Sequence, residues 1–340
     1  MRYANPPNLL GGLVLFVVLA SCGPTPQAGG GIGGTGATAS IVASGPITGF
    51  GSIFVSGTEY DTTHTSMMVD GNSGNQSDLK KGMIVRVNAT VPEGSGMDEP
   101  VLRTANTVLY EDTVEGFVQS VAADGTGLIV LGQTVTITPA TAIDVSILGG
   151  SVANLIPGRD LVEISGFVMG DGLIRATWVE LKRLDQKTDA PDYHAKGFIK
   201  HHHADQHTFE IGDLTLDYRN AVLNDMPAQS NNGWDGLLID VAGNQTSTEG
   251  SGSSRIRLTA TRVSQENLGL GEGEVADIEG IVTQTLRAGD FFIGNVHVLT
   301  DAGTTFQGGA LNEIRVGVHM EVHGSLVGGM VKATAVEFKP

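Results

Sequence analysis

Apolar and polar residues alternate along most of the chain beyond residue 44. Typical segments are Val135-Thr136-Ile137 and Val162-Glu163-Ile164. A period of two places every second side chain on the same face of a β-strand. Asp124-Gly125 and Gly149-Gly150 supply turns between such segments, and the best helical candidate is a short turn at Ala153-Asn154-Leu155. The pattern therefore predicts an all-β protein.

The strand segments recur in the same order along the chain. One copy begins with Gly116-Phe117-Val118, two more begin with Gly197-Phe198-Ile199 and Gly280-Ile281-Val282, and a more divergent copy begins with Ile47-Thr48-Gly49. Each copy predicts a hairpin, a third strand, a loop or short helix, and a final hairpin. This is the element order of an OB-like five-stranded barrel. We predict a tandem array of four such modules, at residues 45–111, 112–186, 194–266 and 274–340, with a β-sandwich of the same strands as the alternative.

The composition agrees with a folded β protein and excludes several other classes. Glycine accounts for 48 of the 340 residues, which suits small barrels because they need bends and bulges. Apolar residues make up 40% of the chain, too many for a disordered protein. The formal net charge of −17 argues against nucleic acid as a partner, because an acidic surface repels phosphate groups.

Residues 1–21 predict a secretory signal peptide. Arg2 precedes an apolar run at residues 9–18 that ends in small residues. A membrane-spanning anchor is the alternative, although such a helix needs about 20 apolar residues. The segment Leu19-Ala20-Ser21-Cys22 resembles a bacterial lipobox, and the chain's only cysteine stands at the lipidated position. The resemblance implies that acyl chains on Cys22 hold the protein on a membrane.

Residues 22–44 have the composition of a flexible, glycine-rich tether. The run Gly31-Ile32-Gly33-Gly34-Thr35-Gly36 matches a dinucleotide-binding pattern, but that pattern requires a strand before it and a helix after it. We therefore assign it to the tether. Gly23 follows the cysteine, and by resemblance to enterobacterial lipoproteins this implies delivery to the outer membrane of a bacterial cell envelope. The side of that membrane, periplasmic or external, is left open.

One segment carries a family resemblance. Gly45-Pro46-Ile47-Thr48-Gly49-Phe50-Gly51-Ser52-Ile53-Phe54-Val55, with the glycine-rich run before it and the repeats behind it, resembles the bacterial DUF5666 lipoproteins. That family has no assigned function. The resemblance therefore implies the architecture and gives no catalytic residues.

The sharpest chemical cluster is a histidine-rich turn in the third predicted module. His201, His202, His203 and His207 fall within seven residues, between two strand segments. On a strand His201 and His203 share a face, and His207 could approach them from across the turn. Imidazole groups suit zinc, copper or nickel. We treat His201, His203 and His207 as candidate metal ligands, with a polar exposed turn as the alternative and with Asp205 and His194 as weaker candidates.

A carboxylate recurs at one position of three modules. Glu163, Asp240 and Glu321 each stand between two apolar residues, and Arg86 takes the same place in the first module. Paired carboxylates perform acid–base chemistry in hydrolases. Because these acids belong to different modules and alternate with apolar residues, we expect them on the solvated outer face of each strand.

These observations favour a non-enzymatic, lipid-anchored envelope protein that binds or assembles with a protein or glycan partner. They predict no cofactor. A transition-metal-binding protein that uses the histidine turn and a hydrolase acting on an envelope polymer are the alternatives. The chain contains no G-x-S-x-G, C-x-x-C, H-E-x-x-H or P-loop motif.

Overall fold

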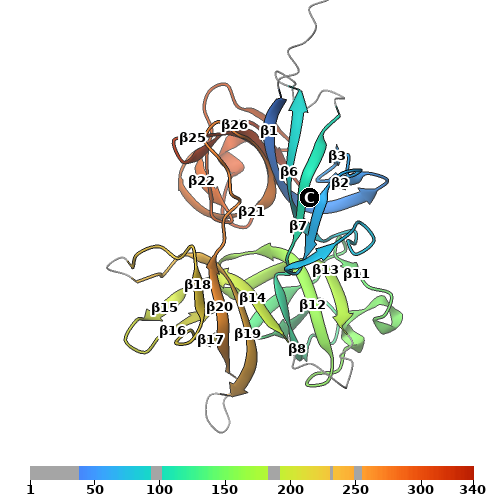
Figure 1. The fold of residues 1–340 in the computed structure, drawn as a ribbon, viewed down its shortest axis with the longest axis vertical. Helices are drawn as coiled ribbons and strands as arrows, with labels where there is room; N and C mark the ends of the chain where they lie inside the picture. Colours follow the sequence, from blue (N-terminus) through green and yellow to red (C-terminus); the bar gives the residue numbers. More distant parts are fainter. Residues whose placement is uncertain (1–37, 93–101, 183–191, 230–232, 249–254) are drawn as a thin grey trace, which may run out of the picture. The chain divides into compact units, whose positions relative to one another are not determined.

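A computed structural model describes residues 38–92, 102–182, 192–229, 233–248 and 255–340. Residues Ala37–Pro340 form one compact unit. The predicted signal peptide, Cys22 and the tether up to residue 37 lie outside the described residues. Within the part that the structure describes, no helix has the length and apolar character needed to cross a membrane. Apart from four short 3₁₀ turns, all regular secondary structure of the described chain is β-strand (Figure 1).

The strands between residues 114 and 182 close into a five-stranded barrel. Its members are β8 (Val114–Val121), β9 (Gly127–Val130), β10 (Gln133–Thr136), β12 (Leu161–Val168) and β13 (Leu173–Lys182). Four of the five pairings are antiparallel, and β10 runs parallel to β13. The short β11 (Ala142–Ile143) extends the sheet beside β13. The 3₁₀ turns η1 (Leu148–Gly150) and η2 (Val152–Asn154) follow it, and η3 (Gly170–Gly172) links β12 to β13.

A second barrel of the same topology closes at the end of the chain. Its members are β21 (Val275–Arg287), β22 (Asp290–Ile293), β23 (Val296–Leu299), β25 (His319–Val327) and β26 (Met330–Phe338). Here β23 runs parallel to β26 and the other pairings are antiparallel. The short β24 (Thr305–Gln307) runs parallel to β26, and η4 (Leu311–Glu313) follows it. Figure 1 shows these strands as an orange-to-red ring. The two barrels confirm the predicted all-β, five-stranded barrel architecture.

The third set of strands lies between the two barrels in sequence. It consists of β14 (Tyr193–Phe198), β15 (Lys200–His203), β16 (Thr208–Ile211), β17 (Leu214–Asp217), β18 (Val222–Asn224), β19 (Leu238–Thr248) and β20 (Ile256–Gln265). β17 and β18 run parallel to β20, while β19 pairs antiparallel with both β14 and β20. β15 continues the path of β14 and pairs with β16.

The first set of strands precedes the first barrel. It consists of β1 (Thr38–Phe50), β2 (Ile53–Val55), β3 (Thr58–Tyr60), β4 (Ser66–Val69), β5 (Asn72–Gly74), β6 (Ile84–Pro92) and β7 (Thr104–Tyr110). β1 pairs antiparallel with β2 and β6, and β6 pairs antiparallel with β7. A single parallel bridge from Asp61 to Thr104 joins the end of the β2–β3 hairpin to β7.

Strand pairing joins these sets of strands to one another. β1 runs parallel to β21, so the earliest described strand pairs with the barrel at the end of the chain. β8 pairs antiparallel with β14, with His194 opposite Glu115. The sets are therefore fused through shared sheets.

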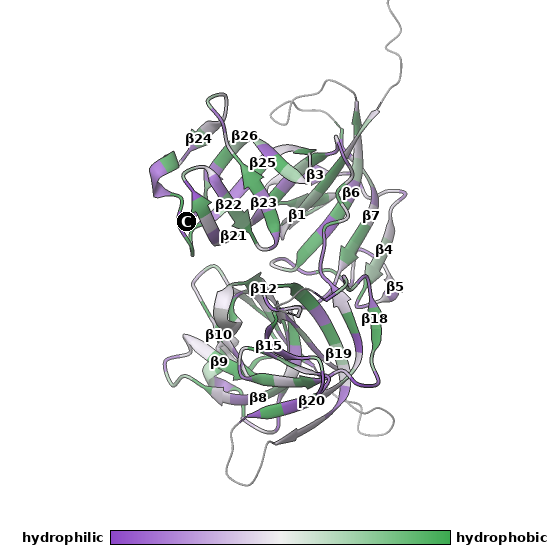
Figure 2. Ribbon diagram, turned by 90° about the vertical axis from the view of Figure 1, so that its left-hand side faces the viewer, coloured by the Kyte–Doolittle hydropathy of each residue, from purple (hydrophilic) through white to green (hydrophobic). Residues whose placement is uncertain are grey.

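The barrel interiors hold the alternating apolar residues. Val162 and Ile164 are fully buried in one core cluster, and Met320 and Val322 are buried in another. Figure 2 shows hydrophobic and hydrophilic residues alternating along strands such as β19 and β20. A third cluster lies among the first strands, and Trp178 of β13 packs against it.

A glycine in the first strand of each barrel makes room for the hairpin that folds over it. A Cβ atom on Gly116 would lie 2.6 Å from Leu131 Cγ, and one on Gly280 would lie 2.5 Å from Ile293 Cγ2. The same approach occurs in the third set, where a Cβ on Gly197 would lie 2.1 Å from Ile211 Cγ2. The recurrent glycine therefore has a steric cause.

We expect Gly280→Ala to lower the free energy of unfolding by about 1–3 kcal/mol, because the added methyl group overfills the barrel against Ile293. Chemical denaturation of the purified protein measures this. Gly170→Ala is the control, since nothing lies within 4 Å of its added Cβ, and it should change the stability by less than about 0.5 kcal/mol. Equal effects of the two substitutions would contradict the steric explanation.

Candidate functional site

The repeated carboxylates are buried, which corrects the expectation that they are solvated. Glu163 is 1% exposed, and Asp240 and Glu321 are each 2% exposed. Their apolar neighbours point into the cores, so alternation places the acids on the opposite, outer face of each strand, as expected. That face is covered by other strands instead of water. A buried carboxylate requires ion pairs or hydrogen bonds, and each acid has a different set.

Asp240 lies among three cations. Its carboxylate is 2.5 Å from His194 Nε2, 3.8 Å from Lys196 Nζ and 3.0 Å from an Arg262 guanidinium nitrogen. Burial alone would raise the pKa of Asp240, but His194, Lys196 and Arg262 hold it well below its usual value. The other ring nitrogen of His194, Nδ1, is 2.5 Å from Asp112 Oδ1. His194 thus links the segment before β8 to β19.

Lys196 also fills the centre of a group of three acids. Its Nζ is 3.7 Å from Glu111, 3.8 Å from Asp240 and 3.8 Å from Glu266. The ligand atoms of these three acids lie within 4.8 Å of one another, close enough to hold a metal ion. The ammonium group of Lys196 supplies a cation from the chain itself.

Glu163 receives a hydrogen bond from another set of strands. Tyr110, at the end of β7, donates from its hydroxyl to Glu163 Oε1 at 2.7 Å, and Lys182 pairs with Oε2. Burial, followed by repulsion from Asp112, raises the pKa of Glu163. Two further acids belong to this group: burial and the neighbouring carboxylates raise the pKa of Asp70 to about 7 and that of Glu115 to about 8.

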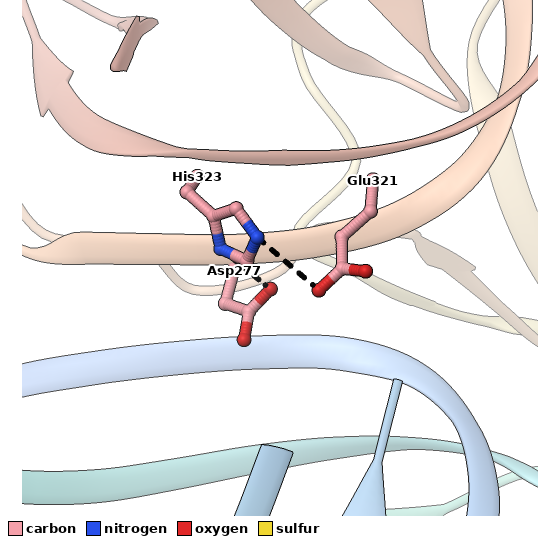
Figure 3. A group of neighbouring side chains, drawn as sticks. All are labelled: Asp277, Glu321 and His323. Carbon is pink, nitrogen blue, oxygen red and sulfur yellow. Dashed lines mark ion pairs between the residues drawn. The ribbon is translucent and has the colours of Figure 1, made fainter. Parts of the chain in front are cut away.

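Glu321 belongs to a compact group with Asp277 and His323 (Figure 3). Asp277 stands opposite His323 where β21 pairs with β25, and Glu321 lies two residues before His323 on β25. Asp277 Oδ1 is 3.1 Å from His323 Nδ1, and Glu321 Oε1 is 3.4 Å from His323 Nε2. Burial and the adjacent Asp277 raise the pKa of Glu321 to about 8. Asp277 and Glu321 are both 2% exposed.

A pocket of about 160 Å³ opens where all four sets of strands meet. Its wall is largely apolar, with Phe167, Leu238, Ile281 and Ile293 among the lining residues. Five charged residues also line it, namely Arg86, Glu111, Lys196, Glu266 and Glu279. An apolar pocket with a few polar groups is the usual form of a small-molecule site.

The histidine turn forms the β15–β16 hairpin, and its candidate ligands His201, His203 and His207 are exposed. His201 Nδ1 lies 2.8 Å from Glu210 Oε2. His202 instead packs inward. Its ring is stacked on that of Trp234, with the two ring centroids 4.7 Å apart, and its Nε2 lies 2.7 Å from the Tyr218 hydroxyl oxygen. Two groups among the described residues have the spacing of metal ligands, one around Lys196 and one around His323, and neither contains a residue of the histidine turn. A metal site there stays a prediction.

The sequence interpretation missed Asp277, Tyr60, Tyr110 and the three lysines that neutralise buried acids. A signal for two of these lysines was present. Lys182 is the last residue of β13 and Lys339 directly follows β26, in the matching segments Val179-Glu180-Leu181-Lys182 and Val336-Glu337-Phe338-Lys339. No comparable repeat marks the tyrosines, which come from other sets of strands.

Comparison with known families identifies the two closed barrels. Residues 115–180 and 279–337 each match a domain of unknown function, DUF5666. The chain therefore contains two copies of this domain, and they coincide with β8–β13 and β21–β26. No curated protein matches the chain.

We expect the free energy of unfolding to fall as the pH rises from about 4.5 to about 8, with Glu115 contributing. Its carboxyl group keeps a proton up to about pH 8 in the folded chain but loses it near pH 4.5 when unfolded, so the unfolded state binds fewer protons across this range. Glu115→Gln removes that titration. Denaturation midpoints of variant and parent should be similar near pH 4.5 and should diverge in favour of the variant toward pH 8.

Glu59→Gln is the matched control, since Glu59 is an exposed acid on β3. It reports the general effect of removing one negative charge. A difference between Glu115→Gln and the parent that does not change with pH would contradict the assignment.

Proposed function

We propose that this chain is a lipid-anchored envelope protein that presents four OB-like β-modules as a non-enzymatic binding scaffold for a protein or glycan partner. In this proposal Cys22 carries the lipid and the protein is delivered to the outer membrane. The tether is shorter than the predicted residues 22–44 and ends by residue 37, because β1 begins at Thr38. The observation that supports a non-enzymatic role is the pairing of the repeated acids. Glu163, Asp240 and Glu321 are buried, and each pairs with a cation of its own set of strands.

The proposal of four modules is supported by the pairings of the first and third sets of strands. In both, the first strand pairs with the last hairpin, as in the two closed barrels. The third strand runs parallel to the final strand in the third set, and in the first set a single parallel bridge from Asp61, just after β3, reaches β7. A short strand also lies parallel to the final strand in all four sets: β4, β11, β18 and β24. The same order therefore recurs beyond the two DUF5666 copies.

A binding role fits the acids better than hydrolysis does. Acid–base catalysis by two carboxylates requires them to face one substrate bond. Glu163, Asp240 and Glu321 instead lie on three different strands, and each is in contact with a lysine, histidine or arginine. Removing one member of such a buried pair destabilises a protein by about 3–5 kcal/mol, so we assign these acids to assembly of the fold.

The loop after β11 is the first surface to test for a partner. Val145 is 97% exposed and Leu148 is 79% exposed. Loops on a rigid scaffold frequently carry binding residues, and exposed apolar groups mark interaction surfaces. Because the strand sets share sheets, point substitutions test this surface without exposing a sheet edge, whereas deletion of a whole module would expose one.

We expect cross-linking mass spectrometry on intact envelopes to recover a reproducible partner of the native protein. Val145→Asp with Leu148→Asp should reduce the recovered cross-links by about tenfold or more, the loss expected when hot-spot side chains are removed. Val222→Asp with Leu223→Asp, at exposed positions of β18, is the control. No partner beyond abundant envelope proteins would contradict the scaffold proposal.

The lipid anchor has its own test. Cys22→Ser removes the thiol that takes the lipid, so the protein should move from the membrane fraction to the soluble fraction and lose labelling by a radioactive fatty acid, since acyl chains supply the membrane affinity. Ser21→Ala keeps the thiol and should retain both. Unchanged membrane association of the Cys22→Ser protein would overturn the proposed anchor.

A further inference from the structure

We propose that Asp277, Glu321 and His323 form a binding site for a transition metal ion, with Zn²⁺ as the best match. The proposal is independent of the envelope role and of the histidine turn. Two carboxylates and one imidazole are ligand types that zinc accepts, and three protein ligands leave a position for water. The ligand atoms of the three residues lie within 4.8 Å of one another.

The strands place these three side chains together. Asp277 and His323 are direct partners across the antiparallel β21–β25 pair, where opposite side chains lie about 5 Å apart at Cβ. Glu321 and His323 are two residues apart on β25 and therefore share a face. Figure 3 shows the imidazole of His323 facing both carboxylates, which lie beside each other.

Neighbouring donors hold the outer oxygen of each carboxylate. The Tyr60 hydroxyl donates to Asp277 Oδ2 at 3.4 Å, and Lys339 Nζ lies 2.5 Å from Glu321 Oε2. The other oxygens, Asp277 Oδ1 and Glu321 Oε1, face His323. Metal ligands are commonly oriented in this way, with one oxygen fixed by an outer partner and the other left for the ion.

A second observation points to an ion at this site. Asp277 is 2% exposed, and its Oδ1 accepts no hydrogen bond from an N–H group or hydroxyl group of the described residues, so that its close neighbours are the His323 imidazole and the Glu321 carboxyl group. That atom is directed at the imidazole without hydrogen-bond geometry, although the two are only 3.1 Å apart. A buried carboxylate oxygen without a hydrogen bond is costly, and a bound cation would satisfy it.

A second group of described residues with metal-ligand spacing provides a contrast. Glu111, Asp240 and Glu266 also have metal-ligand spacing, but Lys196 lies within 3.8 Å of all three. Its ammonium group occupies the position that an ion would take. At the proposed site the ammonium group of Lys339 pairs with the outer oxygen of Glu321 and with Glu337. It does not contact the carboxylate oxygens that face His323, so an ion can still approach those oxygens.

The test is titration of the untagged, chelator-treated full chain with Zn²⁺ by calorimetry, and with Co²⁺ by visible absorption. Glu321→Gln and His323→Gln are expected to weaken zinc binding by about tenfold or more. The triple variant His201→Gln, His203→Gln and His207→Gln is the matched control and should retain one bound Zn²⁺. X-ray absorption at the zinc edge of the parent should show oxygen ligands with a single imidazole, a result that needs no variant.

Two outcomes would overturn the proposal. One is a parent protein that binds zinc no more tightly than about 1 mM Kd, which would leave the group as ion pairs only. The other is binding that the triple variant abolishes and His323→Gln leaves intact, with several imidazoles in the absorption spectrum. That result would assign the metal to the histidine turn.

Discussion

Neutralisation of buried charge where the sets of strands meet is the constraint on which this structure depends. A barrel strand has one face in its own core, and here its other face is covered as well. Glu163, Asp240 and Glu321 occupy that second face. Removing an ion from water is costly unless its geometry and partners are good. Each acid therefore requires donors close by. Asp240 and Glu321 have cations from their own sets of strands, whereas Glu163 also accepts a hydrogen bond from Tyr110 of the first set.

Tyrosines of the first set of strands show how such a junction works. Tyr60 and Tyr110 are fully buried in its core, yet their hydroxyl groups reach Asp277 of β21 and Glu163 of β12. One end of each side chain packs with apolar residues and the other end satisfies a carboxylate of a neighbouring barrel. The core of the first set and the charges of both barrels are thereby linked through two side chains.

Strand order adds a second link between distant parts of the chain. β1 lies between β6 and β21, so β1 has a partner on both sides and exposes no free edge along this stretch. Unpaired edges are sites of unwanted association. Pairing the first set of strands with the last barrel closes that edge and places the two ends of the described chain in one sheet, while the first barrel and the third set form the other sheet.

The sequence was sufficient to predict the strands and their core-facing side chains, but not the residues that cover the outer faces of those strands. The period of two around Val162-Glu163-Ile164 correctly predicted which side chains enter the barrel. It could not predict that Glu163 is buried too, because the covering residues, Tyr110 and Lys182, are 53 and 19 positions away. The same limit applied to the histidine turn, where spacing drew attention to His201 and His203, while Trp234 and Tyr218 bring His202 inward.

The partners of the repeated acid differ from one set of strands to the next. Here one acid meets Tyr110 and Lys182, the next meets His194, Lys196 and Arg262, and the third meets His323 and Lys339, while the first set carries Arg86 at the matching position. Among these partners Tyr110 alone reaches its acid from another set of strands, and the cations belong to the acid's own set. The charge of each buried acid is therefore compensated within its own strands, and removing one member of such a pair costs several kcal/mol. At Glu163 the same position also takes part in a junction, because the hydroxyl of Tyr110 comes from the first set.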